Sequence, residues 1–305
     1  MPVPNATQTD RASLAGPVAA LVVGAFAMGI SPVFVRWAEV GPFASAFWRV
    51  TLALPVLWLW MRLDERGRPR GRSFSRAIWL CGLVFTGDLF VWHLSIVKTT
   101  VANATFFATT APVWVVVFGW LLFGERAARA TLAGLALCLA GGAALIGQSV
   151  TISATRVAGD LYGLATAVFF GLYFLTVRAA RRDSGAARVT FEASLITAML
   201  LFAVALAAEG KFLPDTGAGW AAMFGMSWIS HAGGQGLLAV ALGQLPATFS
   251  SLVIFLEAVA GALFGWALLG EPVTWPQALG GLAILAGIWI ARPRAAAPAP
   301  SSPAS

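Results

Sequence analysis

Four ionisable side chains, those of Asp88, His93, His231 and Glu257, lie inside long apolar stretches of the sequence. A charged side chain at the centre of a bilayer costs about 2.5–3.5 kcal/mol on insertion scales, so each of these residues is a candidate for function. A carboxylate there can bind a cationic group or carry a proton, and an imidazole can donate or accept a hydrogen bond. The structural alternative for each residue is a hydrogen bond that holds two helices together.

Helical spacing predicts which of these residues can share a site. Asp88 and His93 are five residues apart, or about 140° around a helix, so they do not share a face. Asp88 lies on a stripe with Trp92, and His93 lies on another stripe with Phe90. We expect only one of the two stripes to point squarely into a cavity.

A polar strip in the apolar segment 219–241 is a second candidate feature. Ser227, His231 and Gln235 recur at four-residue spacing, which places them on one face of a helix. Because polar side chains are costly against lipid, this face must contact protein or water. Glu257 lies about midway along the next apolar segment.

Arg49 lies about seven residues, or roughly 10 Å, inside another apolar segment, 43–61. We expect its long side chain to extend toward the nearer membrane interface and place its charge in water. The alternative is that Arg49 binds a carboxylate group of a substrate.

The composition predicts that helices crossing a membrane must position these residues. The chain of 305 residues is 59% hydrophobic and 11% charged, with a mean hydropathy of +0.81, whereas about a quarter of the residues of soluble domains are charged. Continuous apolar runs of about 20 residues indicate transmembrane helices, and the alternation typical of barrel strands is missing. The ten predicted segments are 14–38, 43–61, 77–97, 101–123, 130–148, 159–178, 189–209, 219–241, 247–269 and 275–291.

The basic residues predict the orientation of these segments. If the N-terminus is cytoplasmic, fifteen Lys and Arg residues fall on the cytoplasmic side and four on the other. This bias follows the positive-inside rule and places both termini in the cytoplasm. The net charge of +7 therefore needs no nucleic-acid partner.

A repeated phrase predicts the internal organisation of the chain. FGWLLFGE at 118–125 returns as FGWALLGE at 264–271, an offset of 146 residues. At the same offset Gly134 aligns with Gly280, and Gly141 with Gly287. Two halves of five helices each must enter the membrane in opposite directions, as in many secondary transporters. The predicted parts are a disordered tail 1–13, a first repeat 14–148, a connection 149–158, an inverted second repeat 159–291 and a disordered tail 292–305.

These phrases resemble the ten-helix branch of the drug/metabolite transporter superfamily, which is built from EamA-type repeats. AFWR (46–49), NATFFATTAP (103–112) and FLEA (255–258) match the same pattern. Within this family the sequence looks most like the aromatic amino-acid exporters of the YddG type. The resemblance implies that the first, third, fourth, sixth, eighth and ninth helices line a central pathway. Ala258 stands where family members often have proline, which leaves a kink in the ninth helix open, whereas Pro112 keeps one available in the fourth.

The sequence therefore predicts an all-α membrane protein with a central cavity. We expect a multi-pass, secondary active or facilitative transporter of the bacterial inner membrane that exports amino acids, aromatic ones included, by alternating access. The alternatives are an exporter of another metabolite or of a cationic drug, and a membrane-embedded enzyme acting on lipid-linked substrates. We expect membrane lipid as the surroundings, no cofactor or metal, and a monomer, with a dimer as the alternative. The candidate substrate-binding residues are Met28, Ser31, Phe90, Trp92, His93, Phe169 (or its neighbour Phe170), Tyr173, Ser227, Trp228, His231 and Gln235, and the candidates for proton or polar coupling are Asp88 and Glu257.

Overall fold

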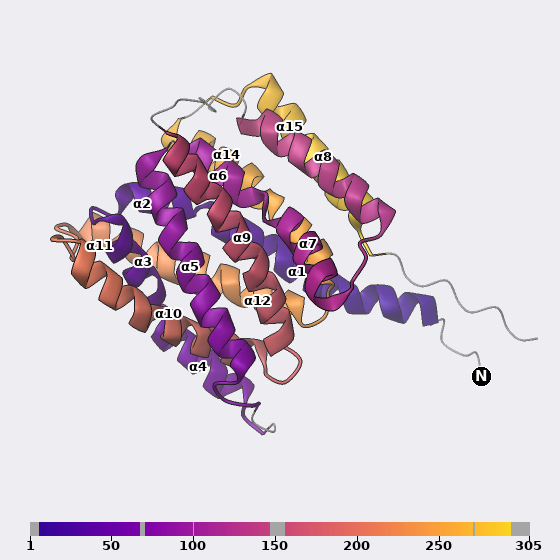
Figure 1. Cartoon of the computed structure of the whole chain (residues 1–305), viewed down its shortest axis with the longest axis horizontal. Helices are drawn as coiled ribbons and strands as arrows, with labels where there is room; N and C mark the ends of the chain where they lie inside the picture. The colour runs from indigo at the N-terminus through magenta and orange to yellow at the C-terminus, as the bar shows by residue number, and fades with distance from the viewer. Residues whose placement is uncertain (1–5, 68–70, 100, 147–155, 271, 294–305) are drawn as a thin grey trace, which may run out of the picture.

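The computed structural model describes residues 6–67, 71–99, 101–146, 156–270 and 272–293. Within these ranges the chain forms helices and turns and no strand (Figure 1). Seven of its helical stretches are long and apolar enough to cross a membrane, which confirms a multi-pass membrane protein. These seven stretches are Leu14–Trp37, Pro42–Asp64, Arg76–Lys98, Ala104–Phe123, Val157–Ala180, Ala186–Ala208 and Ala247–Leu268.

Many of the predicted segments are divided into shorter helices by turns or changes of helix type. The elements are α1 (Ala6–Gly29), α2 (Ser31–Trp37), α3 (Pro42–Thr51), α4 (Leu54–Asp64), α5 (Arg76–Lys98), α6 (Val101–Thr109), α7 (Ala111–Phe123), α8 (Arg129–Ile146), α9 (Val157–Ala180), α10 (Ala186–Ala208), α11 (Gly217–Gly225), η1 (Met226–Gln235), α12 (Gly236–Leu242), α13 (Ala247–Val253), α14 (Phe255–Leu269) and α15 (Trp275–Ala291).

Three of the ten predicted segments are helical but are not among the seven long spans. Segments 130–148 and 275–291 correspond to α8 and α15, which are shorter apolar helices. Segment 219–241 is divided because η1 is a π-helix, with hydrogen bonds from i to i+5, between two α-helical pieces. Such π-helical turns are rare and often occur at functional sites.

The ends of the chain differ in part from the expectation of disordered tails. Helix α1 already begins at Ala6, inside the stretch 1–13. Residues 1–5 and 294–305, and residues 149–155 of the predicted connection, lie outside the described residues.

Four of the seven long spans are divided into two helices, which are α1 and α2, α3 and α4, α6 and α7, and α13 and α14. The break between α6 and α7 lies at Thr110, two residues before Pro112, where the sequence left a kink available. The break between α13 and α14 lies at Ile254 and has no proline. There the backbone N–H of Ile254 bonds to the Ser251 carbonyl (3.1 Å), and the N–H of Glu257 bonds to the Ile254 carbonyl (2.8 Å). These tight i to i+3 bonds interrupt the α-helix without proline.

Helices α8 and α15 pack against each other as an antiparallel pair, which Figure 1 shows at the edge of the bundle. Gly134 faces Gly287, and Gly141 faces Gly280. A Cβ added at Gly134 would lie 2.5 Å from the Gly287 carbonyl oxygen, and one at Gly141 would lie 2.6 Å from that of Gly280. Small residues allow this close approach, as in many membrane helix pairs.

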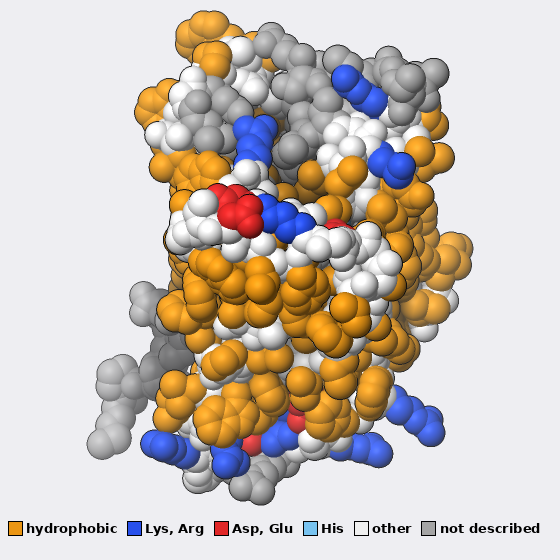
Figure 2. Space-filling view, turned by 90° about the vertical axis from the view of Figure 1, so that its left-hand side faces the viewer, with side chains coloured by type: hydrophobic (Ala, Val, Ile, Leu, Met, Phe, Trp, Pro, Cys, Tyr) orange, Lys and Arg blue, Asp and Glu red, His pale blue; other side chains and the backbone are white. Residues whose placement is uncertain are grey.

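The surface of the bundle is apolar in its middle. Figure 2 shows a broad band of hydrophobic side chains on one face, with basic and acidic side chains gathered above and below it. Large apolar side chains such as those of Leu206, Trp266 and Leu282 are more than half exposed. An exposed apolar band of this kind fits contact with lipid.

The two ends of the bundle are held by different contacts. At one end, here called the α4–α5 end (residues 64–67, 71–76, 181–188 and 243–246), the Arg188 side chain pairs with Glu65 at 2.6 Å. At the opposite α2–α3 end (residues 37–44 and 208–219), the Glu209 carboxylate accepts hydrogen bonds from the backbone N–H groups of Phe43 (2.5 Å) and Ala44 (2.9 Å). Glu209 thereby caps the N-terminus of α3, where N–H groups lack helical partners.

Glu39 makes the equivalent contact with the N-terminus of α11. Its carboxylate accepts hydrogen bonds from the hydroxyl (2.6 Å) and N–H (3.0 Å) of Thr216 and from the N–H of Asp215 (3.1 Å). The hydroxyl bond from Thr216 is the largest cause that lowers the pKa of Glu39, with desolvation acting against it and the backbone bonds adding to it.

We expect the stabilisation from Glu39 to depend on pH. A carboxyl group whose pKa is lowered by folding stabilises the folded state above its unfolded pKa, about 4.3, and this contribution is lost as the pH falls through the lowered value. Melting temperatures of the wild type and Glu39→Gln in detergent should therefore differ at neutral pH and converge in acid. A difference that does not change with pH would contradict this assignment.

Candidate functional site

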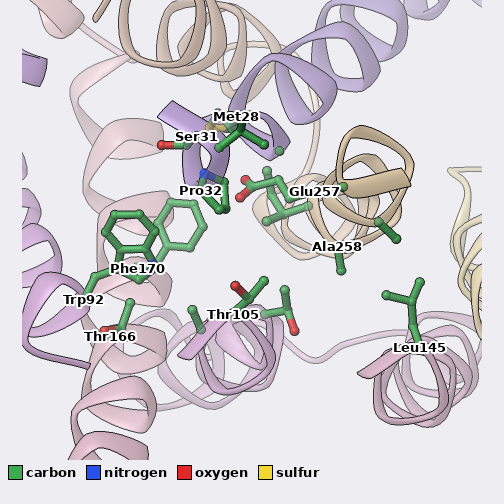
Figure 3. Close-up of a pocket in the computed structure, with 18 of the residues that line it drawn as sticks. Met28, Ser31, Pro32, Trp92, Thr105, Leu145, Thr166, Phe170, Glu257 and Ala258 are labelled. Carbon is green, nitrogen blue, oxygen red and sulfur yellow. The ribbon is translucent and has the colours of Figure 1, made fainter. Parts of the chain in front are cut away.

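A cavity of about 650 Å³ lies between helices from both halves of the chain. Its volume is in the range of small-molecule sites, about 300–1,000 Å³. In Figure 3, Met28, Ser31 and Glu257 lie along one part of its wall, and Trp92, Thr166 and Phe170 lie along another. The predicted site residues that line it are Met28, Ser31, Asp88, Trp92, Gln235 and Glu257.

The cavity extends toward only one end of the bundle. Arg36 at the end of α2, and Pro272 and Thr274 just before α15, are among its lining residues. Among the described residues, none of the α4–α5 end lines it. The cavity is therefore directed toward the α2–α3 end and closed toward the other.

Several polar atoms of the lining residues are buried without a hydrogen-bond partner in the described part of the chain. They are Oδ1 of Asp88, Oε1 of Glu257, Oε1 of Gln235 and Oγ of Ser31. Buried polar groups in proteins are normally hydrogen-bonded, to protein or to water. These atoms are therefore available to bind a ligand, a proton or water.

Arg49 does not reach an interface, contrary to our expectation from the sequence. Its side chain is only 6% exposed and lines the cavity. Helix α3 begins at Pro42, and Arg49 lies two turns further along, on a buried face packed against α5 and α10. The arginine is thus held inside the protein, close enough to Asp88 and Glu257 for their charges to interact.

Aromatic rings form part of the cavity wall. Phe85, Trp92 and Phe170 line it, and the Arg49 guanidinium lies 5.8 Å from the centre of the Trp92 ring. Phe85 stacks on Tyr173 with a ring distance of 4.7 Å. Such a wall suits an apolar or aromatic group of a ligand.

The two stripes of α5 have different surroundings. Asp88 and Trp92 line the cavity, whereas His93 is fully buried and its Nδ1 lies 2.7 Å from the Leu89 carbonyl oxygen. Phe90 stacks on Phe43 of α3 at 5.0 Å. The structure therefore directs the Asp88 stripe into the cavity and the His93 stripe into helix packing.

The polar strip of the eighth predicted segment is divided between two environments. Gln235 lines the cavity. His231 instead lies against α10 and α5: its Nε2 is 2.8 Å from the Ser194 hydroxyl, and its ring stacks on Phe85 at 5.5 Å. Ser227 is fully buried outside the cavity lining.

Three predicted aromatic residues also lie outside the lining. Trp228 is 51% exposed, and its indole N–H donates a 3.0 Å hydrogen bond to the Leu52 carbonyl. Tyr173 packs behind Phe85. Phe169 lies against Gly87 of α5, and its neighbour Phe170 is the residue that lines the cavity.

Thr105 and Thr109 line the cavity and were not among the candidates from the sequence. Their four-residue spacing in NATFFATTAP, just before the break at Thr110, was the signal that could have indicated them. The Thr109 hydroxyl bonds to the Phe106 carbonyl (2.7 Å).

The repeated phrase is structural in its first copy. Gly124 ends α7 with a φ of 68°, a conformation that favours glycine. Glu125 then forms an ion pair with Arg178 of α9, with Nη1 and Oε2 2.7 Å apart. Glu271, its counterpart in the second copy, lies outside the described residues.

These features define a multi-pass α-helical membrane protein with a polar, ring-lined cavity between its helices. Residues 16–147 and 157–292 match the EamA-like transporter family, and the chain belongs to this family. Family membership indicates a transporter, not an enzyme.

Curated relatives agree with this assignment, and a solved structure shares the fold. Two proteins of Archaeoglobus fulgidus, each named an uncharacterized transporter, are similar to this chain. One is 27% identical over 90% of this chain and 95% of its own length, and the other is 26% identical over 83% and 88%. A crystal structure of a protein aligns with a TM-score of 0.80 and 19% identity, covering 91% of this chain and 97% of that one, and bears on the fold alone.

Proposed function

We propose that this protein is a secondary transporter that exports amino acids, aromatic ones included, by alternating access. The observation that carries this proposal is one cavity that combines unpartnered carboxylate oxygens of Asp88 and Glu257 with the rings of Phe85, Trp92 and Phe170. A carboxylate suits the ammonium group of an amino acid, and the rings suit its side chain. The likeness of the sequence to aromatic amino-acid exporters agrees with this choice.

We further propose that the chain crosses the membrane ten times, as two inverted repeats of five helices. The contacts between α8 and α15 support this symmetry. Gly134 is the repeat equivalent of Gly280, and Gly141 of Gly287, and the contacts join Gly134 to Gly287 and Gly141 to Gly280. Exchanging the two halves converts one contact into the other, as a two-fold axis between the helices requires. The Cys138 thiol lies 3.6 Å from the carbonyl of Ile284, its own equivalent at the offset of 146.

The orientation that we propose places both termini in the cytoplasm of a bacterial cell, with the protein in the inner membrane. The cavity then opens to the outside through the α2–α3 end, and the α4–α5 end is the closed cytoplasmic side. Its closure is supported by the ion pairs of Arg188 with Glu65 and of Arg178 with Glu125. Exchange of conformations between the inverted halves would open the cavity to the cytoplasm instead.

The energy for transport comes, in this proposal, from the substrate gradient or from protons. The sequence has no phosphate-binding loop of the kind that binds ATP. Asp88 and Glu257 are the groups in the cavity best suited to carry a proton, because both are acids with a buried oxygen that lacks a partner.

We expect Glu257→Gln and Asp88→Asn to lower the stimulation of transport by a pH gradient at least about tenfold, a change of about 1.4 kcal/mol. The measurement is flux of labelled phenylalanine and other amino acids in liposomes, with and without the gradient. Asp215→Asn, at an exposed acid outside the cavity, is the matched control. No amino-acid flux above that of empty liposomes would refute the amino-acid substrate. Flux that responds neither to the gradient nor to these variants would refute proton coupling.

A cationic drug or another metabolite is the second candidate cargo. The two carboxylates of the cavity, Asp88 and Glu257, favour it, because they can bind a cation that lacks a carboxylate. Uptake of a lipophilic cation that depends on either acid, without amino-acid flux, would support this alternative.

A further inference from the structure

Arg49 is a buried cation to which no hydrogen bond or ion pair is made within the described part of the chain. It is 6% exposed, and its Nε is buried without a hydrogen-bond partner there. Removing a guanidinium from water is costly unless an anion and hydrogen-bond acceptors replace the water. An arginine kept in this state beside a cavity is therefore poised to bind an anion that enters the cavity.

The surroundings of Arg49 limit which anion can bind. Asp88 and Glu257 are near enough for charge interaction but are not bonded to Arg49. A doubly charged group such as phosphate would be repelled by both carboxylates more strongly than a singly charged group would be. A single carboxylate matches the fork of one guanidinium, which can donate two parallel hydrogen bonds to it.

The ring of Trp92 lies on one side of the Arg49 guanidinium. The Arg49 guanidinium lies 5.8 Å from the Trp92 ring centre, within the range of a cation–π contact. Trp92 shares its stripe of α5 with Asp88, so one helix presents both a ring and an acid to the same cavity. A small zwitterion can therefore contact the guanidinium, an acid and a ring at once.

We propose that Arg49 binds the carboxylate of the substrate and is the residue that makes the cavity selective for free amino acids over their amides and decarboxylated amines. This inference rests on the proposed amino-acid transport. Asp88 or Glu257 then takes the ammonium group, and the side chain lies against Trp92 and Phe170. Removal of the substrate carboxylate leaves Arg49 buried and unpaired again, which disfavours the analogue.

The first test uses the wild-type protein in liposomes. We expect phenylalaninamide and phenethylamine to compete with labelled phenylalanine at least about 100-fold less well than unlabelled phenylalanine does, because a site built around a polar partner rejects an analogue that lacks it. Absence of phenylalanine flux would refute the proposed function. Phenylalanine flux that the two analogues inhibit as well as phenylalanine does would refute the role of Arg49 alone.

The second test uses variants. Arg49→Gln should lose phenylalanine flux while phenethylamine flux is retained or raised, and Arg49→Lys should keep part of the phenylalanine flux, since lysine keeps the charge but not the fork. Unchanged preference for phenylalanine in Arg49→Gln would overturn the proposal. Arg49→Gln carries neither compound if it misfolds, which its melting temperature would show. In that case, the competition by phenylalaninamide and phenethylamine in the wild type decides whether the proposal holds.

Discussion

Replacing Glu192 with glutamine is expected to lower the free energy of unfolding by about 1.5–3 kcal/mol, since it removes a buried charged hydrogen-bond acceptor while Arg188 keeps its second partner, Glu65. The Arg188 and Glu192 side chains are 9% and 3% exposed, and Nη1 lies 2.7 Å from Oε1. The same carboxylate accepts hydrogen bonds from the Ser73 hydroxyl (2.7 Å) and the Phe74 N–H (2.6 Å). An amide accepts at only one of these two oxygen positions, so either the Phe74 N–H at Oε2 or the Ser73 hydroxyl and Arg188 at Oε1 lose their acceptor.

The backbone at Phe74 adds to the expected loss. Phe74 has a φ of 45°, in the left-handed region that residues other than glycine rarely adopt. The hydrogen bond from its N–H to Glu192 holds this conformation just before α5. Without that bond, nothing offsets the strain at Phe74, and the segment before α5 packs less stably on α10.

A second ion pair of the same sequence spacing provides the control. Lys211 and Asp215 are also four residues apart in the sequence, and Lys211 Nζ lies 2.6 Å from Asp215 Oδ2. Their side chains, however, are 48% and 72% exposed. Exposed pairs contribute about 0–1 kcal/mol, so Asp215→Asn should change stability little. Both variants are to be compared with the wild type by denaturant unfolding in detergent. If Glu192→Gln and Asp215→Asn lost equal free energies of unfolding, burial would not be what determines the contribution of the Arg188–Glu192 pair.

The features that could be predicted from the sequence are those that depend on local composition. The long apolar stretches became helices because backbone groups inside a membrane must be hydrogen-bonded within their own segment. Asp88 and Glu257 were identified for a related reason, since an acid in an apolar stretch is costly wherever the helix faces. The structure places both in the cavity.

The features that could not be predicted depend on neighbouring helices. Spacing separated Asp88 from His93 but could not say which of them faces the cavity. That choice follows from the packing of α5 on its neighbouring helices, which leaves His93 fully buried outside the cavity lining. The same limit applied to Arg49. Its long side chain was expected to reach the membrane interface, but the packing of α3 against α5 and α10 keeps it buried.

Backbone irregularities were predictable only where a proline marks them. Pro112 indicated the break at Thr110, whereas the break at Ile254 arises from two tight turns in a sequence without proline. The π-helix η1 likewise has no single residue that requires it. The surroundings of the polar strip on η1 were not predictable either, since His231 contacts Ser194 of α10 and Gln235 lines the cavity.

Replacing Gly280 with alanine is expected to lower the free energy of unfolding by about 1–3 kcal/mol, the usual cost of overfilling a packed interface. A Cβ at this position would lie 2.5 Å from the Gly141 carbonyl oxygen and 2.7 Å from the Leu145 backbone nitrogen. Both are backbone atoms of α8, so no side chain can move aside. The two helices would have to separate, and the cavity residue Leu145 lies on the helix that moves.

The next residue, Gly281, makes this prediction testable within one turn of α15. A Cβ there would meet nothing within 4 Å, so Gly281→Ala gains the helix preference of alanine, about 0.5–1 kcal/mol, without a clash. The two neighbouring substitutions should therefore shift the denaturant midpoint in opposite directions. If both variants shifted it equally, the close packing of α8 against α15 could not be the cause. A loss confined to Gly280→Ala would show that the glycines of the repeated helix set the distance between the two halves at this point.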